Sequence, residues 1–181
     1  MSILRRVINK LRGHIDVDFL KKKGLVIGKN VFINFGCIID ESFCWLVEIG
    51  DNVTFAPNVH ILAHDASTKR ELGYTKIGGV KIGSNVFVGA GSIILPRTHI
   101  GNKVVIGAGS VVSSDIPDNS VAVGVPARVI CQYDTYMEKE KAFMKISPQY
   151  DISYTEKGNV SDEKKQRVKE ELGTDKRGYI V

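Results

Sequence analysis

Aliphatic residues recur at every sixth position through the middle of the chain, and a small residue follows most of them. The recurring residues are Ile82, Val88, Ile94, Ile100, Ile106 and Val112. The segment IGSNVF at residue 82 returns as IGNKVV at residue 100, so the full period is 18 residues, made of three unlike hexads. A repeat of this length is typical of a solenoid, in which each unit packs on the next one.

A hexad suits a short strand that is followed by a corner. About four residues with a rise of roughly 3.3 Å form the strand, and two residues remain for a corner, where Gly, Asn and Asp reach positive φ at little cost. Three strands and three corners then close one triangular coil, with the first residue of each hexad pointing inward. The sequence therefore predicts an all-β solenoid of parallel strands with a column of stacked aliphatic side chains.

The phase of the repeat assigns the coils. Full coils are expected at residues 27–44, 49–66, 82–99 and 100–117, followed by a partial fifth coil and the closing segment VGVPARVI. The phase is broken at residues 45–48 and again at residues 67–81. Both breaks fall between the third hexad of one coil and the first hexad of the next, so we expect both at the same edge of the prism.

Three regions follow from this pattern: an arm at 1–24, the solenoid at 25–130 with a loop at 67–81, and an extension at 131–181. Residues 2–12 predict a short amphipathic helix, which either caps the open end of the solenoid or makes a weak peripheral contact with a membrane. The polar extension predicts helices at 134–145 and 161–172, with Ser161 as the N-cap and Gly173 as the stop, and partial disorder elsewhere.

Charge and composition exclude several classes of protein. Residues 1–24 hold seven Lys and Arg against two Asp, a net +5 that equals the charge of the whole chain, so the solenoid is neutral and no nucleic-acid partner is expected. No apolar run reaches 18 residues, and the N-terminus lacks the apolar region of a signal peptide. Three cysteines without a CxxC pair predict reduced, mostly buried thiols in a cytoplasmic protein. With the basic helix at residues 2–12, such a protein is at most associated with the inner face of the membrane.

His64 is the strongest candidate for chemistry. It is the fourth residue of a third hexad, at a corner, immediately before the only long break in the repeat. A long excursion from a regular scaffold usually serves function, although a solvated corner histidine would give the same pattern. His60 and His99 end their hexads and are more simply explained as edge residues.

Residues 24–130 resemble the hexapeptide-repeat acyltransferases. The segment NVHILAHDAST and the closing GVPARVI are most similar to the sugar O-acetyltransferases, which include the maltose, galactoside and nodulation-factor enzymes and those that modify capsular or O-antigen polysaccharide. The resemblance implies a left-handed parallel β-helix that forms a homotrimer with sites between subunits. It also implies acetyl-CoA as cosubstrate, a hydroxyl of a sugar or polysaccharide precursor as acceptor, and no metal.

The resemblance also implies roles for single residues. His64 matches the family's catalytic histidine, whose neutral imidazole takes the proton of the attacking hydroxyl. The backbone N–H of Ala90, in the VGAG corner, matches the donor that stabilises the tetrahedral oxyanion across a subunit boundary. Asp65 is one candidate for orienting the ring, and a backbone carbonyl is another, because adjacent side chains of an extended segment diverge.

Two further groups of residues are expected to bind the substrates. The cofactor groove should follow stacked corners at Gly89, Ala90, Gly107, Ala108 and Ser113, with Arg128 near a phosphate. The acceptor side should include Asn34, Asp40, Tyr74 and Phe87. The small corner residues are also what the fold itself needs, and Asn34 could instead be a left-handed corner asparagine.

Departures from the pattern leave other functions open. Phe87 stands where the galactoside and maltose enzymes have tryptophan, and Ser114 stands where a lysine is usual. A non-catalytic assembly scaffold is one alternative. A γ-type carbonic anhydrase is another, but it needs three histidines on zinc, and His60 and His64 lie in different hexads separated by a corner. A serine acetyltransferase would need a helical N-terminal domain, which 26 residues cannot supply.

Overall fold

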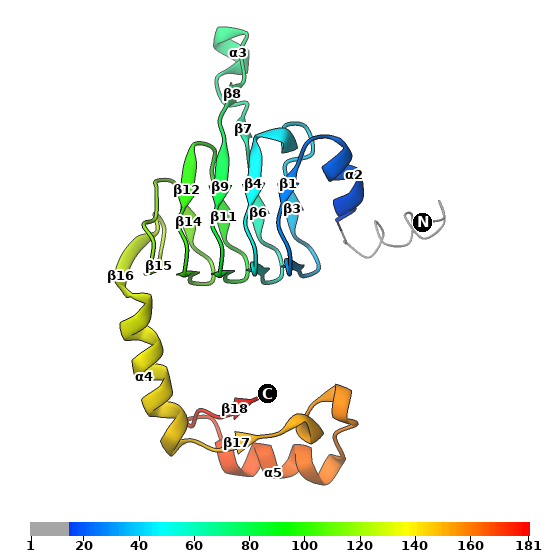
Figure 1. The fold of residues 1–181 in the computed structure, drawn as a ribbon, viewed down its shortest axis with the longest axis vertical. Coiled ribbons are helices and arrows are strands. Elements are labelled where there is room, and N and C mark those ends of the chain that lie inside the picture. Colours follow the sequence, from blue (N-terminus) through cyan, green and yellow to red (C-terminus); the bar gives the residue numbers. More distant parts are fainter. Residues whose placement is uncertain (1–14) are drawn as a thin grey trace. The chain divides into compact units, whose positions relative to one another are not determined.

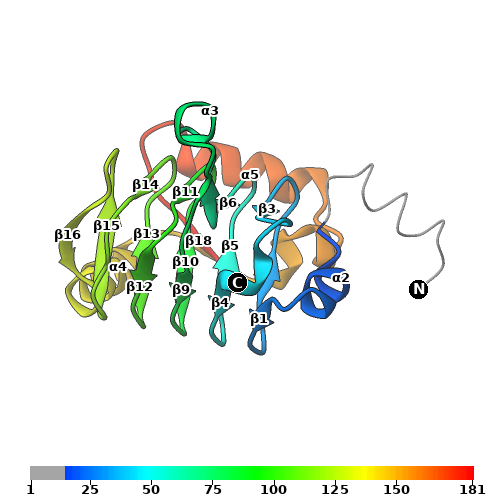
Figure 2. The same ribbon diagram turned by 90° about the horizontal axis from the view of Figure 1, so that it is seen from above.

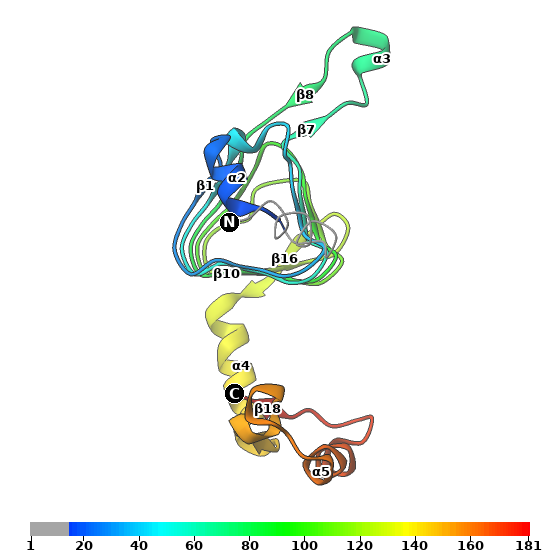
Figure 3. The same ribbon diagram turned by 90° about the vertical axis from the view of Figure 1, so that its right-hand side faces the viewer.

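The structure, a computed structural model, describes residues 15–181, and the chain divides into two units, residues 1–133 and 134–181. The first unit is a three-sided solenoid, which Figure 3 shows end on. The helix predicted at residues 2–12, with its capping or membrane role, lies outside the described residues. Within residues 15–181, no helix is both long enough and apolar enough to cross a membrane.

Short strands stack into three sheets, which form the three faces of the prism (Figures 1 and 2). The first sheet contains β1 (Val26–Ile27), β4 (Val47–Ile49), β9 (Val80–Ile82) and β12 (Thr98–Ile100). The second sheet contains β2 (Phe32–Ile33), β5 (Thr54–Phe55), β10 (Val86–Val88), β13 (Val104–Ile106), β15 (Ser120–Val123) and β16 (Arg128–Gln132). The third sheet contains β3 (Ile38–Ile39), β6 (His60–Ile61), β11 (Ile93–Ile94) and β14 (Val111–Val112). Within these three sheets, strand pairing is parallel except between β15 and β16.

The strand register confirms the 18-residue coil. Val86 pairs with Val104, and Ile93 pairs with Val111, so each residue lies beside the one a full coil later. The first hexad positions form the buried column, with Ile27 and Ile33 of the first coil only partly buried. Its fully buried members include Phe55, Ile61, Ile82, Val88, Ile94, Ile100, Ile106 and Val112. Because burial of one such side chain contributes about 1.5–3 kcal/mol, this column is the main source of stability in the unit.

The corners use left-handed backbone conformations, as the sequence predicts. Positive φ occurs at Asn30, Asn52, Asn58, Asn85 and Asn119, and also at Arg97 and Lys103. Asparagine reaches this region at low cost because its short polar side chain bonds locally. The repeated asparagine of the hexads is therefore a requirement of the corners.

Both breaks in the repeat lie at the edge between the third sheet and the first, as predicted. The first break contains the 3-10 helix η1 (Cys44–Leu46). The second is an excursion, an antiparallel hairpin of β7 (His64–Asp65) and β8 (Lys76–Ile77) with the short helix α3 (Lys69–Leu72) at its tip, seen at the top of Figure 3. The excursion begins at His64 and the chain rejoins the wall at Val80, so the predicted bounds of 67–81 were too late at both ends.

A short helix that was not predicted from the sequence, α2 (Val17–Lys22), precedes the first coil. Asp16 caps it by accepting the N–H of Phe19 at 3.0 Å. Its one buried residue, Leu20, joins the core cluster. A single buried position gives no helical periodicity, which explains why the sequence does not reveal this helix.

The second unit is folded. It contains α4 (Tyr133–Ile146), β17 (Gln149–Tyr150), η2 (Ile152–Tyr154), η3 (Glu156–Gly158), α5 (Asp162–Leu172) and β18 (Tyr179–Ile180). Ser161 caps α5 and Gly173 ends it, so both predicted helices are confirmed. Elsewhere in the extension, where the sequence left partial disorder open, β17 pairs with β18 and Arg177 bonds Glu140 at 2.9 Å. Such polar contacts leave no apolar period in the sequence.

Candidate functional site

His64 lies where the chain leaves the third sheet for the excursion. Its side chain is 36% exposed, whereas the preceding Ala63 is fully buried. The ring therefore sits at the boundary between the packed prism and solvent. The structure places His64 at the predicted corner, as the first residue of the excursion.

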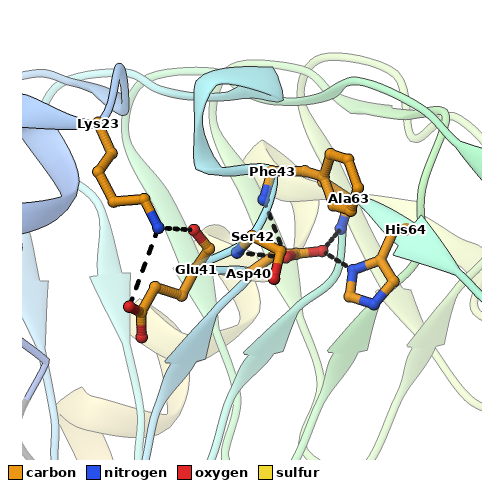
Figure 4. Close-up of polar contacts among 7 residues, drawn as sticks. All are labelled: Lys23, Asp40, Glu41, Ser42, Phe43, Ala63 and His64. Carbon is orange, nitrogen blue, oxygen red and sulfur yellow. Dashed lines mark hydrogen bonds and ion pairs between the residues drawn. The ribbon is translucent and has the colours of Figure 1, made fainter.

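Asp40 holds the ring of His64, and nearly all of Asp40 is buried (Figure 4). Its Oδ2 contacts Nδ1 of His64 and accepts the N–H of Ala63 at 2.9 Å. Its Oδ1 accepts the N–H groups of Ser42 and Phe43 at 3.1 and 3.2 Å. Both oxygens are thus engaged inside the protein. The sequence placed Asp40 among the acceptor-binding residues, and the structure places its carboxylate at Nδ1 of the histidine.

The charge on Asp40 determines which nitrogen of the His64 imidazole carries the proton. Burial raises the pKa of the Asp40 carboxyl, but hydrogen bonds from His64 and from the N–H groups of Ala63 and Phe43 outweigh it, so the pKa lies below its ordinary value. An ionised carboxylate at Nδ1 favours the tautomer with the proton on Nδ1. Nε2 then carries the lone pair, and it makes no hydrogen bond with any described residue. The arrangement creates a base that faces outward.

Asp65 makes its contacts away from the ring of His64. The sequence left Asp65 and a backbone carbonyl as candidates for orienting the ring, and the group at Nδ1 is the Asp40 carboxylate. The Asp65 carboxylate forms a salt bridge with Lys76 and accepts the N–H of Ser67 at 2.8 Å. Lys76 and Ser67 hold the pKa of Asp65 well below its usual range. Successive side chains of a strand point to opposite sides, so Asp65 faces away from the ring of His64 and closes the base of the excursion.

The strap, which we define as residues 40–46, connects the Asp40 carboxylate to an aromatic pair. The ring centroid of Phe43 lies 5.2 Å from that of His64, with the planes tilted by 47°. Phe43 also contacts Trp45, at 5.4 Å between ring centroids. The sequence pattern did not single out these aromatic residues, although their position beside the first break in the repeat was a usable signal.

The strap is anchored to the end of α2. Lys23, the residue after the helix, donates from Nζ to the backbone carbonyl of Glu41 at 2.7 Å (Figure 4). The thiol of Cys44 lies 3.6 Å from the carbonyl oxygen of Leu20. The strap, which carries Asp40, is therefore fixed by α2 on one side and contacts His64 on the other.

Ala90 lies at a different edge of the prism from His64. It follows β10, between the second and third sheets, where the N–H of Gly109 donates to its carbonyl at 2.8 Å. Ala90 is exposed, and its own N–H makes no hydrogen bond with the described part of the chain. This open N–H suits an oxyanion donor. One chain does not bring it to His64, because the width of the third sheet separates the two edges.

The remaining cofactor candidates are divided between these edges. Ala108 shares the edge of Ala90, whereas Ser113 follows β14 at the edge of His64. A Cβ at Gly89 would lie 2.4 Å from the Ala108 nitrogen, and one at Gly107 would lie 2.7 Å from a side-chain carbon of its neighbouring strand. Both glycines are thus required by strand stacking, whatever they bind. Exposed Arg128, at the start of β16, donates to the carbonyl of the preceding residue at 2.9 Å.

The other acceptor candidates lie on separate parts of the surface. Asn34 is exposed between the second and third sheets, and its amide donates to the carbonyl of Phe55 at 2.8 Å. Its backbone is not left-handed, so the alternative of a left-handed corner asparagine is wrong. Phe87 is half exposed on the second sheet, and Tyr74 is exposed on the excursion. Within one chain, the excursion does not bring Tyr74 to the other two.

The described cysteines are free thiols: Cys37 and Cys44 are buried and Cys131 is half-buried, as predicted. Burial raises the pKa of the Cys37 thiol. Among residues 15–181, no cluster of three histidine, cysteine, aspartate or glutamate side chains could hold a metal ion.

A three-sided solenoid of hexads, interrupted at one edge beside a partly exposed histidine, is the architecture of the hexapeptide-repeat proteins. A family model described as bacterial transferase hexapeptide (six repeats) matches residues 79–114. The match falls on the most regular coils of the solenoid.

Comparison with known proteins extends the similarity beyond these coils. The chain is 44% identical over 117 residues to galactoside O-acetyltransferase of Escherichia coli K12, covering 63% of this chain and 57% of that protein. It is 36% identical over 134 residues to protein CapG of Staphylococcus aureus, covering 71% of this chain and 78% of CapG. The chain belongs to the hexapeptide-repeat transferase family.

A solved structure shows a similar fold. A hexapeptide-repeat-containing acetyltransferase of Vibrio cholerae O1 biovar eltor, complexed with acetyl coenzyme A, superposes with a TM-score of 0.55 at 27% identity. The match covers 61% of each chain. The chain thus spans less than two thirds of the length of this structure and of the Escherichia coli relative.

Proposed function

We propose that this protein is an acetyl-CoA-dependent O-acetyltransferase, which transfers an acetyl group to a hydroxyl of a sugar or polysaccharide precursor. The observation that carries the proposal is the buried Asp40 carboxylate at Nδ1 of His64, whose partly exposed ring makes no hydrogen bond from Nε2 to any described residue. The similarity to a galactoside O-acetyltransferase supports a sugar acceptor, and the similarity to a structure complexed with acetyl coenzyme A supports the donor.

The chemistry follows from the two nitrogens of His64. Nε2 takes the proton of the sugar hydroxyl while its oxygen attacks the thioester carbonyl, a contribution of about 10²–10⁴-fold to the rate. The Asp40 carboxylate stabilises the imidazolium that forms. The tetrahedral oxyanion accepts a hydrogen bond from the N–H of Ala90. Collapse breaks the C–S bond, and the imidazolium returns its proton to the departing thiolate, so no acyl-enzyme is formed.

A complete site requires a second copy of the chain. His64 and Ala90 lie at different edges, so the edge with Ala90 on one subunit must face the edge with His64 on the next. The outer surface supports such packing. The second and third sheets expose Phe32, Phe87 and Ile38, whereas the first sheet presents charged residues, including Glu48 and Lys81. A closed ring of three subunits accommodates this head-to-tail contact.

The proposal has further parts that rest on the resemblance. The coils are left-handed, and the cofactor groove follows Gly89, Ala90, Gly107, Ala108 and Ser113, with Arg128 near a phosphate. Asn34, Tyr74 and Phe87 contact the acceptor. The protein acts in the cytoplasm, with at most a weak membrane contact through residues 1–12, and it has no nucleic-acid partner.

The test is an acetyl-transfer assay with the purified full chain. Release of coenzyme A from acetyl-CoA is measured with and without a panel of sugar acceptors, for the wild type and for His64→Ala. We expect sugar-dependent release that the substitution removes. A His64→Ala protein that keeps its activity would contradict the role of the base, and an inactive wild type would favour the scaffold. Light scattering after size exclusion measures the number of subunits, which should be three.

A further inference from the structure

We propose that Trp45 and Phe43 form an aromatic platform that binds the apolar face of the acceptor's pyranose ring beside His64. The inference rests on the proposed function and deepens it, since it gives the acceptor a binding surface and a shape. The platform lies on the strap, at the same edge of the prism as the base.

Trp45 has a fixed place and an open surface. It is the only tryptophan of the chain, and 52% of it is exposed. A Cβ at Gly24 would lie 2.8 Å from the Cβ of Trp45, so Trp45 packs tightly on the second residue after α2. Large aromatic side chains are usually highly buried, and a half-exposed one on an anchored backbone is typical of a binding surface.

Phe43 contacts both Trp45 and the base. Trp45 contacts Phe43 with 5.4 Å between ring centroids, and Phe43 contacts His64 with 5.2 Å. In Figure 4 the ring of Phe43 lies on the side of the strap that faces His64. Nδ1 of His64 is held by Asp40, so Nε2 remains available to a ligand that packs on these aromatic rings.

The surroundings fit a sugar better than a wholly apolar ligand. A pyranose ring has a face of C–H groups, which packs on an aromatic ring, and a rim of hydroxyls, which need hydrogen-bonding partners. The same strap carries Ser42, which is exposed, and Glu41, whose side chain is 63% exposed. An acyclic polyol has the same hydroxyls but no fixed apolar face.

The platform also separates the two substrates along the solenoid. The strap leaves the first coil, on the N-terminal side of His64. The residues proposed for the cofactor, from Gly89 to Ser113, lie in later coils on the C-terminal side. The acceptor and the thioester therefore approach His64 from opposite directions along the axis, as a direct transfer requires.

Fluorescence of the wild-type chain tests binding directly, because all tryptophan emission comes from Trp45. The titrants are the methyl β-pyranosides of glucose, galactose and N-acetylglucosamine, with galactitol as the acyclic control. We expect a saturable change in emission with at least one pyranoside and none with galactitol. No saturable change with any of the three pyranosides, or an equal change with galactitol, would overturn the platform.

Kinetics with the same pyranosides provide the second test. Trp45→Ala should raise the KM for the acceptor about tenfold and leave the KM for acetyl-CoA unchanged, whereas Trp45→Phe should recover part of the loss. Phe143→Ala, which removes a similarly exposed aromatic side chain from the second unit, is the matched control and should change neither constant. Thermal melting followed by circular dichroism checks folding, and Trp45→Leu replaces Trp45→Ala if the latter unfolds.

The two tests separate the platform from the proposed function. Saturable fluorescence without acetyl transfer would contradict the function and leave the platform standing. Acetyl transfer with an unchanged acceptor KM in the Trp45 variants would contradict the platform and leave the function standing.

Discussion

The carboxylate of Asp40 lies against Nδ1 of His64, although the two residues are 24 positions apart in the chain. They meet because the strap and the excursion leave the solenoid at the same edge in successive coils. A buried carboxylate that also accepts three backbone N–H groups cannot rotate away, so it holds the imidazole in one orientation. The base is thus positioned by the preceding coil and not by its neighbour Asp65.

Replacing His64 by alanine should lower kcat for acetyl transfer by about 10²–10⁴-fold, since the general base is lost. The midpoint of thermal unfolding should hardly change, because the side chain is partly exposed and lies outside the core. Coenzyme A release and circular dichroism measure the two effects. His99→Ala, on the outer face of the first sheet, is the control and should keep full activity.

Replacing Asp40 by asparagine should lower kcat on the order of 10²-fold, while the KM for acetyl-CoA stays the same. The amide keeps the size of the side chain but loses the charge that stabilises the imidazolium. Asp65→Asn is the matched control, because Asp65 faces Lys76 and not the ring. Equal losses in the two variants would contradict the assignment of Asp40 as the orienting residue.

The Asp40 carboxylate should also make stability depend on pH in the acid range. Its pKa in the folded chain is below its ordinary value of about 3.9, so the folded state favours the ionised form. The contribution of Asp40 is therefore fully present above the ordinary pKa and is lost as the pH falls through the folded value. Urea unfolding of the wild type and Asp40→Asn between pH 3 and pH 6, a range set by that pKa, should show free energies of unfolding that converge toward the acid end. A difference that grows as the pH falls would contradict this.

Replacing Gly89 by alanine should destabilise the solenoid by about 1–3 kcal/mol, because the added Cβ meets the backbone of the next coil. Gly73→Ala provides the comparison, since no atom lies within 4 Å of a Cβ there and only the left-handed backbone, with φ of 75°, opposes the change. We expect a smaller loss of about 1 kcal/mol at that position. Chemical unfolding measures both.

The sequence by itself determined the solenoid. The six-residue period of Ile82 to Val112 required three-sided coils, and its phase located both breaks at one edge and His64 beside the longer break. These features are visible because every coil must bury the same face against its neighbours, so the requirement repeats along the chain. The corner asparagines and the caps of α5 were predictable for a similar reason, since each obeys a local rule of backbone conformation.

Only the tertiary structure decided what surrounds His64. The stacking of coils brought the Asp40 carboxylate to Nδ1 of the ring and turned Asp65 toward Lys76. It also placed Phe43, with Trp45 against it, next to the base. These contacts join segments from different coils, and each occurs once, so no period or neighbouring motif records them. The same stacking put Ala90 and His64 at different edges, which is why the chemistry proposed for one chain needs a second.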